Sequence, residues 1–311
     1  MSSFDFQTFL HSPSSSSVPA GGPEPISADQ QEKLDELIKK FGDEKYVLEG
    51  EKLTGWEMSF LSREGLLRFL RADKYDLQLC IDRIERCLIW RRKEGMDDLE
   101  GLAKRVEGEQ RTKGGQFVFG YDKSSRPVIF MHPSRREEPP SELGLVHLFY
   151  LFERAIDLMP KHVEKTAFLI DLGGKRKHST PIGLAKEWVS VLQSCYPERL
   201  GLGIIANAPW ALSMFLSLVL RFCDPATRAK IVVAGSSDQG KKLIADTVAE
   251  DQLQAEYGGK HSIPWDVEVH ERYWPALIEV CRKRRAFRLK RWQELGGTVG
   301  ISEEEWKGRD E

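Results

Sequence analysis

Residues 196–233 read YPERLGLGIIANAPWALSMFLSLVLRFCDPATRAKIVV, and this stretch decides the fold. It combines a turn that carries a carboxylate, a short apolar strand, an apolar helix preceded by a proline, and a second strand. Charged side chains are concentrated where these elements join. The pattern suits the binding of a mostly apolar molecule with one polar end, and it offers little for covalent chemistry.

The chain on either side of this stretch predicts an α/β fold. Short runs rich in Val, Ile and Phe, bounded by Gly, Pro or Asp, are typical of strands. These runs are Gln116–Gly120, Pro127–His132, Thr166–Asp171, Leu202–Asn207 and Lys230–Ala234. Helical patterns separate the later runs, at Leu143–Met159, Ile182–Cys195 and Trp210–Phe222. Because strands that alternate with helices form parallel sheets, we expect a mainly parallel sheet flanked by helices, opened by an antiparallel hairpin.

The segments before residue 106 predict a small helical module. Apolar residues recur at helical spacing in Ala28–Phe41, Ser62–Asp73 and Asp76–Lys93. Residues 1–27 are rich in Ser, Pro and Gly and predict a disordered tail. We therefore expect a helical module over residues 28–105 and an α/β domain over residues 106–265. Residues 266–311 predict a basic amphipathic helix, Tyr273–Leu295, and a tail; its basic side chains are expected mainly in solvent.

Composition excludes several classes of protein. A formal net charge of −2 and a pI near 6.4 argue against a nucleic-acid partner, because phosphate binding needs a basic field. Five scattered cysteines without CxxC spacing favour free thiols in a reducing compartment. The chain begins without the pattern of a secretory signal. Its longest strongly apolar helix candidate, Ala211–Leu220, is half of the roughly twenty residues that a bilayer needs. We expect a soluble protein with peripheral membrane contact.

Catalytic motifs are missing from the sequence. It has no GxxxxGK[ST] loop, no GxGxxG after a strand and no GxSxG elbow. Its seven histidines are dispersed, without metal-ligand spacing. We therefore expect a protein that is not an enzyme, with no catalytic residue and no metal.

Three features of residues 196–233 are candidates for binding, each with a structural alternative. Glu198 follows a Tyr-Pro turn, where an ion pair or turn cap is as good an explanation as a ligand contact. Thr227 and Lys230 lie one helical turn apart and can hold a phosphate together, although a solvated lysine is the commoner case. The segment Trp210–Phe222 is apolar nearly all round, as in a buried core helix or in a mobile lid over a lipid.

An ordered set of motifs resembles the CRAL-TRIO family, the lipid-binding domain of yeast-type phosphatidylinositol transfer proteins. The match covers roughly residues 60–292. Its motifs are LLRFLRADKYD (66–76), Trp90–Arg91, Asp122 with Arg126–Pro127–Val128, Ile170–Asp171–Leu172, YPERLG (196–201), NAPW (207–210), DPATRAKI (224–231) and EYGG (256–259). The extension that begins YWPAL is similar to the fungal subfamily tied to azole tolerance and sterol metabolism.

The resemblance implies the CRAL-TRIO lipid-binding fold, with residues 28–105 as its N-terminal type of helical module. It implies a pocket that is floored by the sheet and closed by a gate helix, Trp210–Phe222. The gate residues it implies are Trp210, Met214, Phe215, Leu218 and Phe222. The residues it implies for the lipid headgroup are Glu198, Thr227, Lys230 and Lys74. The family motif FLRARK is FLRADK here, so that Asp73 replaces an arginine, and Arg71 is expected to pair with a nearby carboxylate.

The resemblance also implies a function. We expect a phosphatidylinositol-binding and phospholipid transfer protein, with a bound phospholipid as ligand and no cofactor. Membrane phospholipids are the expected partners, with lipid-metabolic enzymes as further ones. The expected location is cytoplasmic and peripheral on the endoplasmic reticulum, lipid droplets or the plasma membrane. Two alternatives stay open: a sterol or haem carrier on the same fold, and a lipid-sensing regulatory scaffold.

Overall fold

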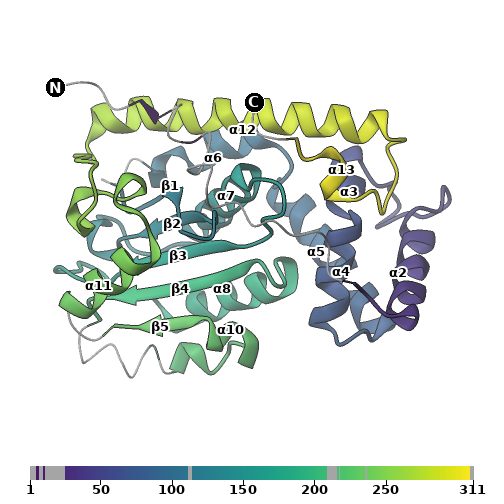
Figure 1. The fold of residues 1–311 in the computed structure, drawn as a ribbon, viewed down its shortest axis with the longest axis horizontal. Helices are drawn as coiled ribbons and strands as arrows, with labels where there is room; N and C mark the ends of the chain where they lie inside the picture. Colours follow the sequence, from purple (N-terminus) through teal and green to yellow (C-terminus); the bar gives the residue numbers. More distant parts are fainter. Residues whose placement is uncertain are drawn as a thin grey trace.

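A five-stranded sheet forms the centre of the α/β part of the molecule (Figure 1). The computed structural model describes Asp5, Phe6, Leu10 and residues 25–110, 114–208, 216, 218–234 and 237–308. The strands, in spatial and chain order, are β1 (Gln116–Tyr121), β2 (Pro127–Met131), β3 (Thr166–Asp171), β4 (Leu200–Ala206) and β5 (Ile231–Val233). β1 is antiparallel to β2, and the other neighbours are parallel. The mainly parallel sheet with an opening hairpin is confirmed, although β4 begins earlier and β5 is shorter than predicted.

Alternation of side chains along the strands gives the sheet two different faces. On β4, Gly203 and Ile205 face an apolar cavity, whereas Ala206 faces helix α11 (Ser237–Thr247). A Cβ added at Gly240 of α11 would lie 3.1 Å from the Ala206 Cβ, so the helix backbone sits directly on the strand. One face of the sheet is therefore closed by α11, and the other is left for a cavity.

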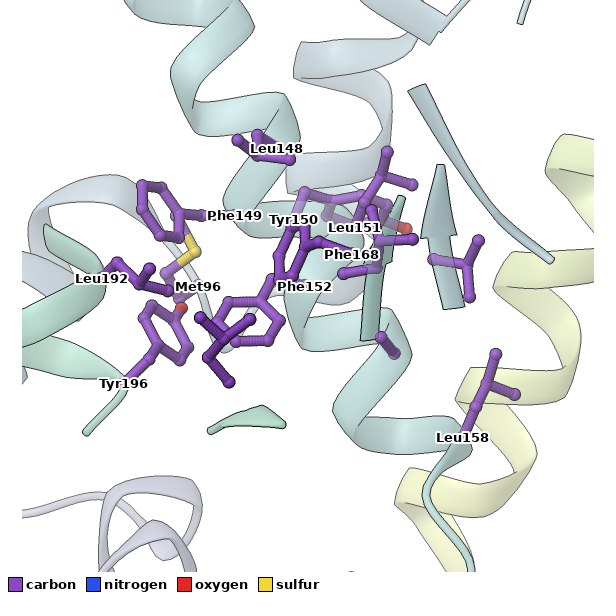
Figure 2. Packing of buried hydrophobic residues seen from close by; sticks show 14 of the residues in the cluster. Met96, Leu148, Phe149, Tyr150, Leu151, Phe152, Leu158, Phe168, Leu192 and Tyr196 are labelled. Carbon is purple, nitrogen blue, oxygen red and sulfur yellow. The ribbon is translucent and has the colours of Figure 1, made fainter. Parts of the chain in front are cut away.

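Helices α7 (Glu142–Leu158) and α8 (Ile182–Cys195) pack beside the cavity face of the sheet. α7 is buried along almost its whole length, which matches its apolar sequence. Figure 2 shows Phe149 and Phe152 of α7 turned toward Tyr196, which follows α8. The rings of Phe149 and Tyr196 stack at 5.4 Å, and those of Phe152 and Tyr196 lie 4.8 Å apart. These contacts fix the turn after α8 that carries Glu198.

The N-terminal module contains the three predicted helices, now bounded as α2 (Ala28–Phe41), α4 (Arg63–Ala72) and α5 (Leu77–Glu94). Ser27, Ser62 and Asp76 each cap the helix that follows, with the side-chain oxygen accepting from a backbone N–H. Two further helices, α3 (Gly55–Phe60) and α6 (Leu99–Gln110), were not predicted. Helices α2 to α5 lie at the right of Figure 1, beside the sheet, whereas α6 lies against α7 and α12 (Val267–Glu294).

Helix α12 (Val267–Glu294) runs along the whole length of the molecule and ends above the helical module, near α13 (Glu303–Trp306) (Figure 1). It begins earlier than the predicted Tyr273 because Asp266 caps it, accepting from the Val269 N–H at 2.9 Å. The prediction of a mainly solvated basic face is wrong for its inner arginines. The Arg284 Nη1 donates to the Leu158 carbonyl at 2.9 Å, which closes the C-terminal end of α7.

Two residues of the predicted disordered tail are packed into the core. Phe6 is 3% exposed and its ring meets that of Tyr273 edge-on at 5.3 Å. Leu10 is 1% exposed, and its carbonyl accepts from the Tyr121 hydroxyl at 3.1 Å. The prediction of disorder is therefore wrong at these two positions.

Candidate functional site

An apolar cavity of about 220 Å³ lies between the sheet, α7 and α8. Its floor and sides are formed by large apolar side chains, among them Leu148, Phe168, Trp188, Leu192 and Ile205. Leu216, Val219, Leu220 and Cys223 form the facing wall. The lining is apolar almost throughout, as expected for a site that binds hydrocarbon.

The facing wall belongs to the predicted gate. Val219 and Leu220 line the cavity, whereas Leu218 is 39% and Phe222 is 38% exposed on the outside. The Lys186 ammonium lies 4.6 Å from the centre of the Phe222 ring. Three predicted gate residues, Trp210, Met214 and Phe215, lie outside the described residues. The described end of the segment thus has one apolar face toward the cavity and another toward solvent.

Glu198 lies in the turn between α8 and β4, with its backbone in the left-handed region at φ 58°. Its side chain is 34% exposed, and its Oε2 accepts from the Arg71 Nε of α4 at 2.6 Å. Glu198 is therefore the carboxylate that Arg71 was expected to pair with. Among the described residues, no hydrogen bond uses the second carboxylate oxygen, so Glu198 can still accept one.

Thr227 lines the cavity from the short helix α10 (Pro225–Ala229). The Asp224 Oδ1 accepts from the Thr227 N–H at 2.9 Å and fixes the start of α10. Lys230 follows at the end of this helix. Its ammonium is half-buried and forms no ion pair within 4.0 Å in the part of the chain that the structure describes. Thr227 thus lines the cavity, and Lys230 follows it by three residues without lining the cavity itself.

Electrostatics connect Lys230 to Glu198. Burial lowers the pKa of Lys230, and Lys165 lowers it further, while Glu198 and Asp224 act in the opposite direction. The pKa of Lys230 thus responds to the charge of Glu198, which links the turn before β4 to the end of α10.

Lys74 is exposed in the turn between α4 and α5 at φ 53°, and like Lys230 and Glu198 it is not among the cavity-lining residues. Its neighbour Asp73 is held by Arg83, whose Nε donates to the Asp73 Oδ2 at 2.8 Å. Arg83 also donates from Nη1 to the Gln193 carbonyl of α8 at 2.9 Å. Asp73 therefore connects helices and does not stand free as an anion beside the headgroup residues.

The turn that carries Glu198 rests on a buried ionic group that the sequence analysis missed. The Glu153 Oε1 of α7 accepts from the Tyr196 hydroxyl at 2.7 Å and from the Arg91 Nη1 at 2.5 Å. Burial would raise the pKa of Glu153, but the charge and hydrogen bond of Arg91 outweigh it and lower the pKa to about 2. The carboxylate stays ionised and holds Tyr196 in place.

Two negative findings concern the described residues alone. They contain no group of three or more His, Cys, Asp or Glu side chains that could hold a metal ion. Within the same ranges, every helix is too short or too polar to cross a bilayer.

Comparisons with known proteins agree with this geometry. The chain matches the model of the CRAL/TRIO domain over residues 111–259 and that of the CRAL/TRIO N-terminal domain over residues 33–86. It is 32% identical over 310 residues to the phosphatidylinositol transfer protein PDR17 of Saccharomyces cerevisiae, covering 92% of this chain and 85% of the relative. It is 34% identical over 293 residues to the CRAL-TRIO domain-containing protein C23B6.04c of Schizosaccharomyces pombe, and spans only 28% of that protein's length.

Among solved structures, the crystal structure of Sfh5 matches with a TM-score of 0.56 at 16% identity, covering 85% of this chain and 99% of Sfh5. That likeness concerns the fold alone. The sheet, the helical module, the two family models and the match to PDR17 over most of both chains lead to one conclusion: the chain belongs to the CRAL/TRIO domain family, among fungal proteins of the phosphatidylinositol transfer type.

Proposed function

We propose that this protein binds phosphatidylinositol and transfers single phospholipids between membranes through the gated apolar cavity. The observation that carries the proposal is the half-buried Lys230, free of ion pairs among the described residues and three residues after Thr227, which lines that cavity. The match to PDR17, whose name describes a phosphatidylinositol transfer protein, supports it.

The acyl chains supply the affinity. Each methylene removed from water contributes roughly 0.8 kcal/mol, so two long chains bind tightly without any polar contact. A cavity of about 220 Å³ is smaller than the roughly 300–1,000 Å³ of usual ligand pockets, and a diacyl lipid is larger than most of their ligands. The wall that carries Val219 and Leu220 must therefore move outward when a lipid enters.

The headgroup supplies the selectivity. A phosphate that leaves water needs donors, because burial of an unpaired charge is prohibitive. The Lys230 ammonium and the Thr227 hydroxyl supply them. The second oxygen of Glu198 accepts from an inositol hydroxyl. A choline headgroup has no hydroxyl to offer, so the carboxylate favours inositol.

The membrane contact is peripheral and uses the outer face of the gate. Leu218 and Phe222 expose apolar surface there, and Lys186 beside Phe222 attracts anionic headgroups. The five cysteines are all free and buried, in keeping with a cytoplasmic protein that docks on the endoplasmic reticulum, lipid droplets or the plasma membrane. Lipid-metabolic enzymes that receive the lipid are the further partners, and the protein performs no covalent chemistry of its own.

Transfer of labelled phosphatidylinositol between vesicles tests the proposal. Lys230→Ala and Glu198→Ala are expected to abolish this transfer. Lys230→Ala should keep the wild-type thermal unfolding midpoint, and Glu198→Ala should lose no more stability than its ion pair with Arg71 supplies. Lys283→Ala, on the exposed side of α12, is the matched control and is expected to transfer normally. Transfer by Lys230→Ala at the wild-type rate would show that the headgroup assignment is wrong.

Mass spectrometry of lipids extracted from the purified protein identifies the natural ligand. We expect phosphatidylinositol. A sterol or haem in its place would favour a carrier for that molecule. Tight lipid occupancy with negligible transfer would favour a lipid-sensing scaffold.

A further inference from the structure

A second cavity, of about 570 Å³, lies at the opposite edge of the sheet from Lys230. It is lined by the segment after β2, from Ser134 to Glu137, and by residues around Gln254 and Trp265. β2 and β3 end at this edge, whereas Glu198 and Lys230 precede their strands and so lie at the other one. In open parallel sheets, the carboxyl edge is where ligands commonly bind.

Buried donors without acceptors surround this cavity. Gln254 is 2% exposed; its Oε1 accepts from the Trp265 Nε1 at 2.9 Å, but its Nε2 has no hydrogen-bond partner in the described part of the chain. The Arg135 Nη1 and the Arg136 Nε are likewise buried without a partner among the described residues. A native protein leaves few such groups unpaired, and several around one cavity call for an acceptor. Each of them donates only, so the missing group is one rich in acceptor oxygens.

The charge at the cavity favours an anion. Lys177 is exposed in the loop after β3, lines the cavity and forms no ion pair in the described part of the chain. Lys175 and Arg176 precede it in the same loop. Gly174, at φ 82°, lets this loop run close to the cavity wall, since a Cβ there would lie 3.1 Å from the Ser134 Oγ.

Most carboxylates near the cavity already form ion pairs or hydrogen bonds. Glu256 pairs with Arg135, and Glu109, outside the lining, accepts from the Arg136 Nη2 at 2.6 Å. Asp171, at the end of β3, accepts from the Tyr257 hydroxyl at 3.1 Å and from the Asn207 Nδ2 at 2.8 Å. Glu137 also lines the cavity. Arg135 and Arg136 therefore each keep a donor beyond their ion pairs, and Lys177 adds an uncompensated charge.

We propose that this cavity binds a phosphate group, carried by a soluble phosphate ester or by an anionic lipid headgroup. Guanidinium, amide and ammonium donors from three separate segments approach such a ligand from different directions, which suits a tetrahedral oxyanion better than a planar carboxylate. A rotation of Gln254 and the two arginines toward the cavity brings their unused N–H groups onto its oxygens. The site is separate from the proposed phosphatidylinositol site, although Arg136 lines both cavities.

Calorimetric titration of the full chain with inorganic phosphate and with glycerol 3-phosphate tests the proposal. Wild-type protein is expected to bind in the millimolar range or tighter. Lys177→Gln, at an exposed position, is expected to weaken binding about tenfold, the effect of one charge-assisted hydrogen bond. Gln254→Glu keeps the acceptor for Trp265 but replaces the unpaired donor by an anion, and is expected to abolish binding. Lys283→Gln is the charge-matched control.

Vesicle sedimentation distinguishes the two sources of phosphate. If the ligand is a lipid headgroup, Lys177→Gln reduces binding to vesicles with phosphatidic acid, and glycerol 3-phosphate competes poorly. If the ligand is soluble, glycerol 3-phosphate binds and vesicle binding is unchanged. Phosphatidylinositol transfer by Lys177→Gln should equal wild type, which separates this site from the proposed function. Absence of binding to either source, or equal binding by wild type, Lys177→Gln and Gln254→Glu, overturns the proposal.

Discussion

Arg71→Gln should impair phosphatidylinositol transfer although Arg71 does not line the lipid cavity. The Arg71 Nε holds the Glu198 Oε2 at 2.6 Å, which leaves the other oxygen of Glu198 for the headgroup. The two side chains are 28% and 34% exposed. Solvent screening therefore reduces the interaction free energy of the ion pair to about 1 kcal/mol, below the usual range for charge-assisted hydrogen bonds. That free energy corresponds to about a fivefold loss of transfer.

The assay compares transfer rates and unfolding midpoints of three variants. Arg282→Gln breaks a more exposed ion pair, Arg282 to Glu279 at 2.7 Å, and serves as the control for the loss of a surface arginine. We expect Arg71→Gln to transfer phosphatidylinositol more slowly than wild type while its unfolding midpoint equals that of the control. Glu198→Gln should reduce the transfer rate further. The double variant Arg71→Gln/Glu198→Gln should lose no more than Glu198→Gln alone, because Arg71 acts through Glu198. Additive losses in the double variant, or unchanged transfer by Arg71→Gln, would refute this reasoning.

Three further predictions concern stability and membrane contact. Glu303→Gln removes the buried carboxylate that lies 2.6 Å from Arg68. The free energy of unfolding, measured in urea, should fall by about 3–5 kcal/mol, and a fall below about 1 kcal/mol would contradict a buried ion pair. The pKa of Glu153 is about 2 in the folded state and 4.5 in the unfolded state. Ionised Glu153 therefore adds roughly 3 kcal/mol to the free energy of unfolding above pH 4.5, and this contribution disappears as the pH falls toward 2. Thermal unfolding against pH should show this slope, and Glu153→Gln should flatten it. Leu218→Ser with Phe222→Ser should slow transfer while leaving lipid occupancy by mass spectrometry unchanged; equal transfer by this variant would exclude the outer face of the gate from docking.

Local signals in the sequence were sufficient for most of the sheet and for the capped helices. Strand alternation and flanking Gly or Pro depend on neighbours a few residues away, and so do the caps at Ser62 and Asp76. Two missed helices carry the same kind of signal. α3 begins with the capping box of Thr54 and Glu57, and α6 has apolar Leu99 and Val106 seven residues apart. Both helices could therefore have been predicted from the sequence.

The basic residues of α12 show where the sequence carries less information. Arg282 and Arg284 are the same residue type on one helix, yet Arg282 pairs with Glu279 at the surface and Arg284 donates to the Leu158 carbonyl. Which arginine turns inward depends on where α7 ends against α12, and that is set by tertiary packing. Charge count alone therefore exaggerates the basic face of this helix and with it the expected attraction to anionic membranes.

The candidate site has the same mixture of local and distant causes. Thr227 and Lys230 are neighbours in the chain, and their placement follows from the Asp224 cap. Glu198 and Arg71 are 127 residues apart, and only the packing of α4 against the turn after α8 brings them together. The sequence predicts the residue types of the site, but not the partner that orients the carboxylate.

A chain of ion pairs joins this carboxylate to the end of the protein. Glu303 on α13 meets Arg68 at 2.6 Å, Arg68 meets Glu164 at 3.0 Å, Glu164 lies 3.9 Å from Arg71, and Arg71 holds Glu198 at 2.6 Å. Arg68 and Arg71 are one turn apart on α4, so one helix face presents both guanidinium groups to Glu164. The helical module and the C-terminal segment thus help to position a headgroup residue without lining the cavity. These ion pairs are a physical reason why the helical module and the α/β domain hold together as one folded unit.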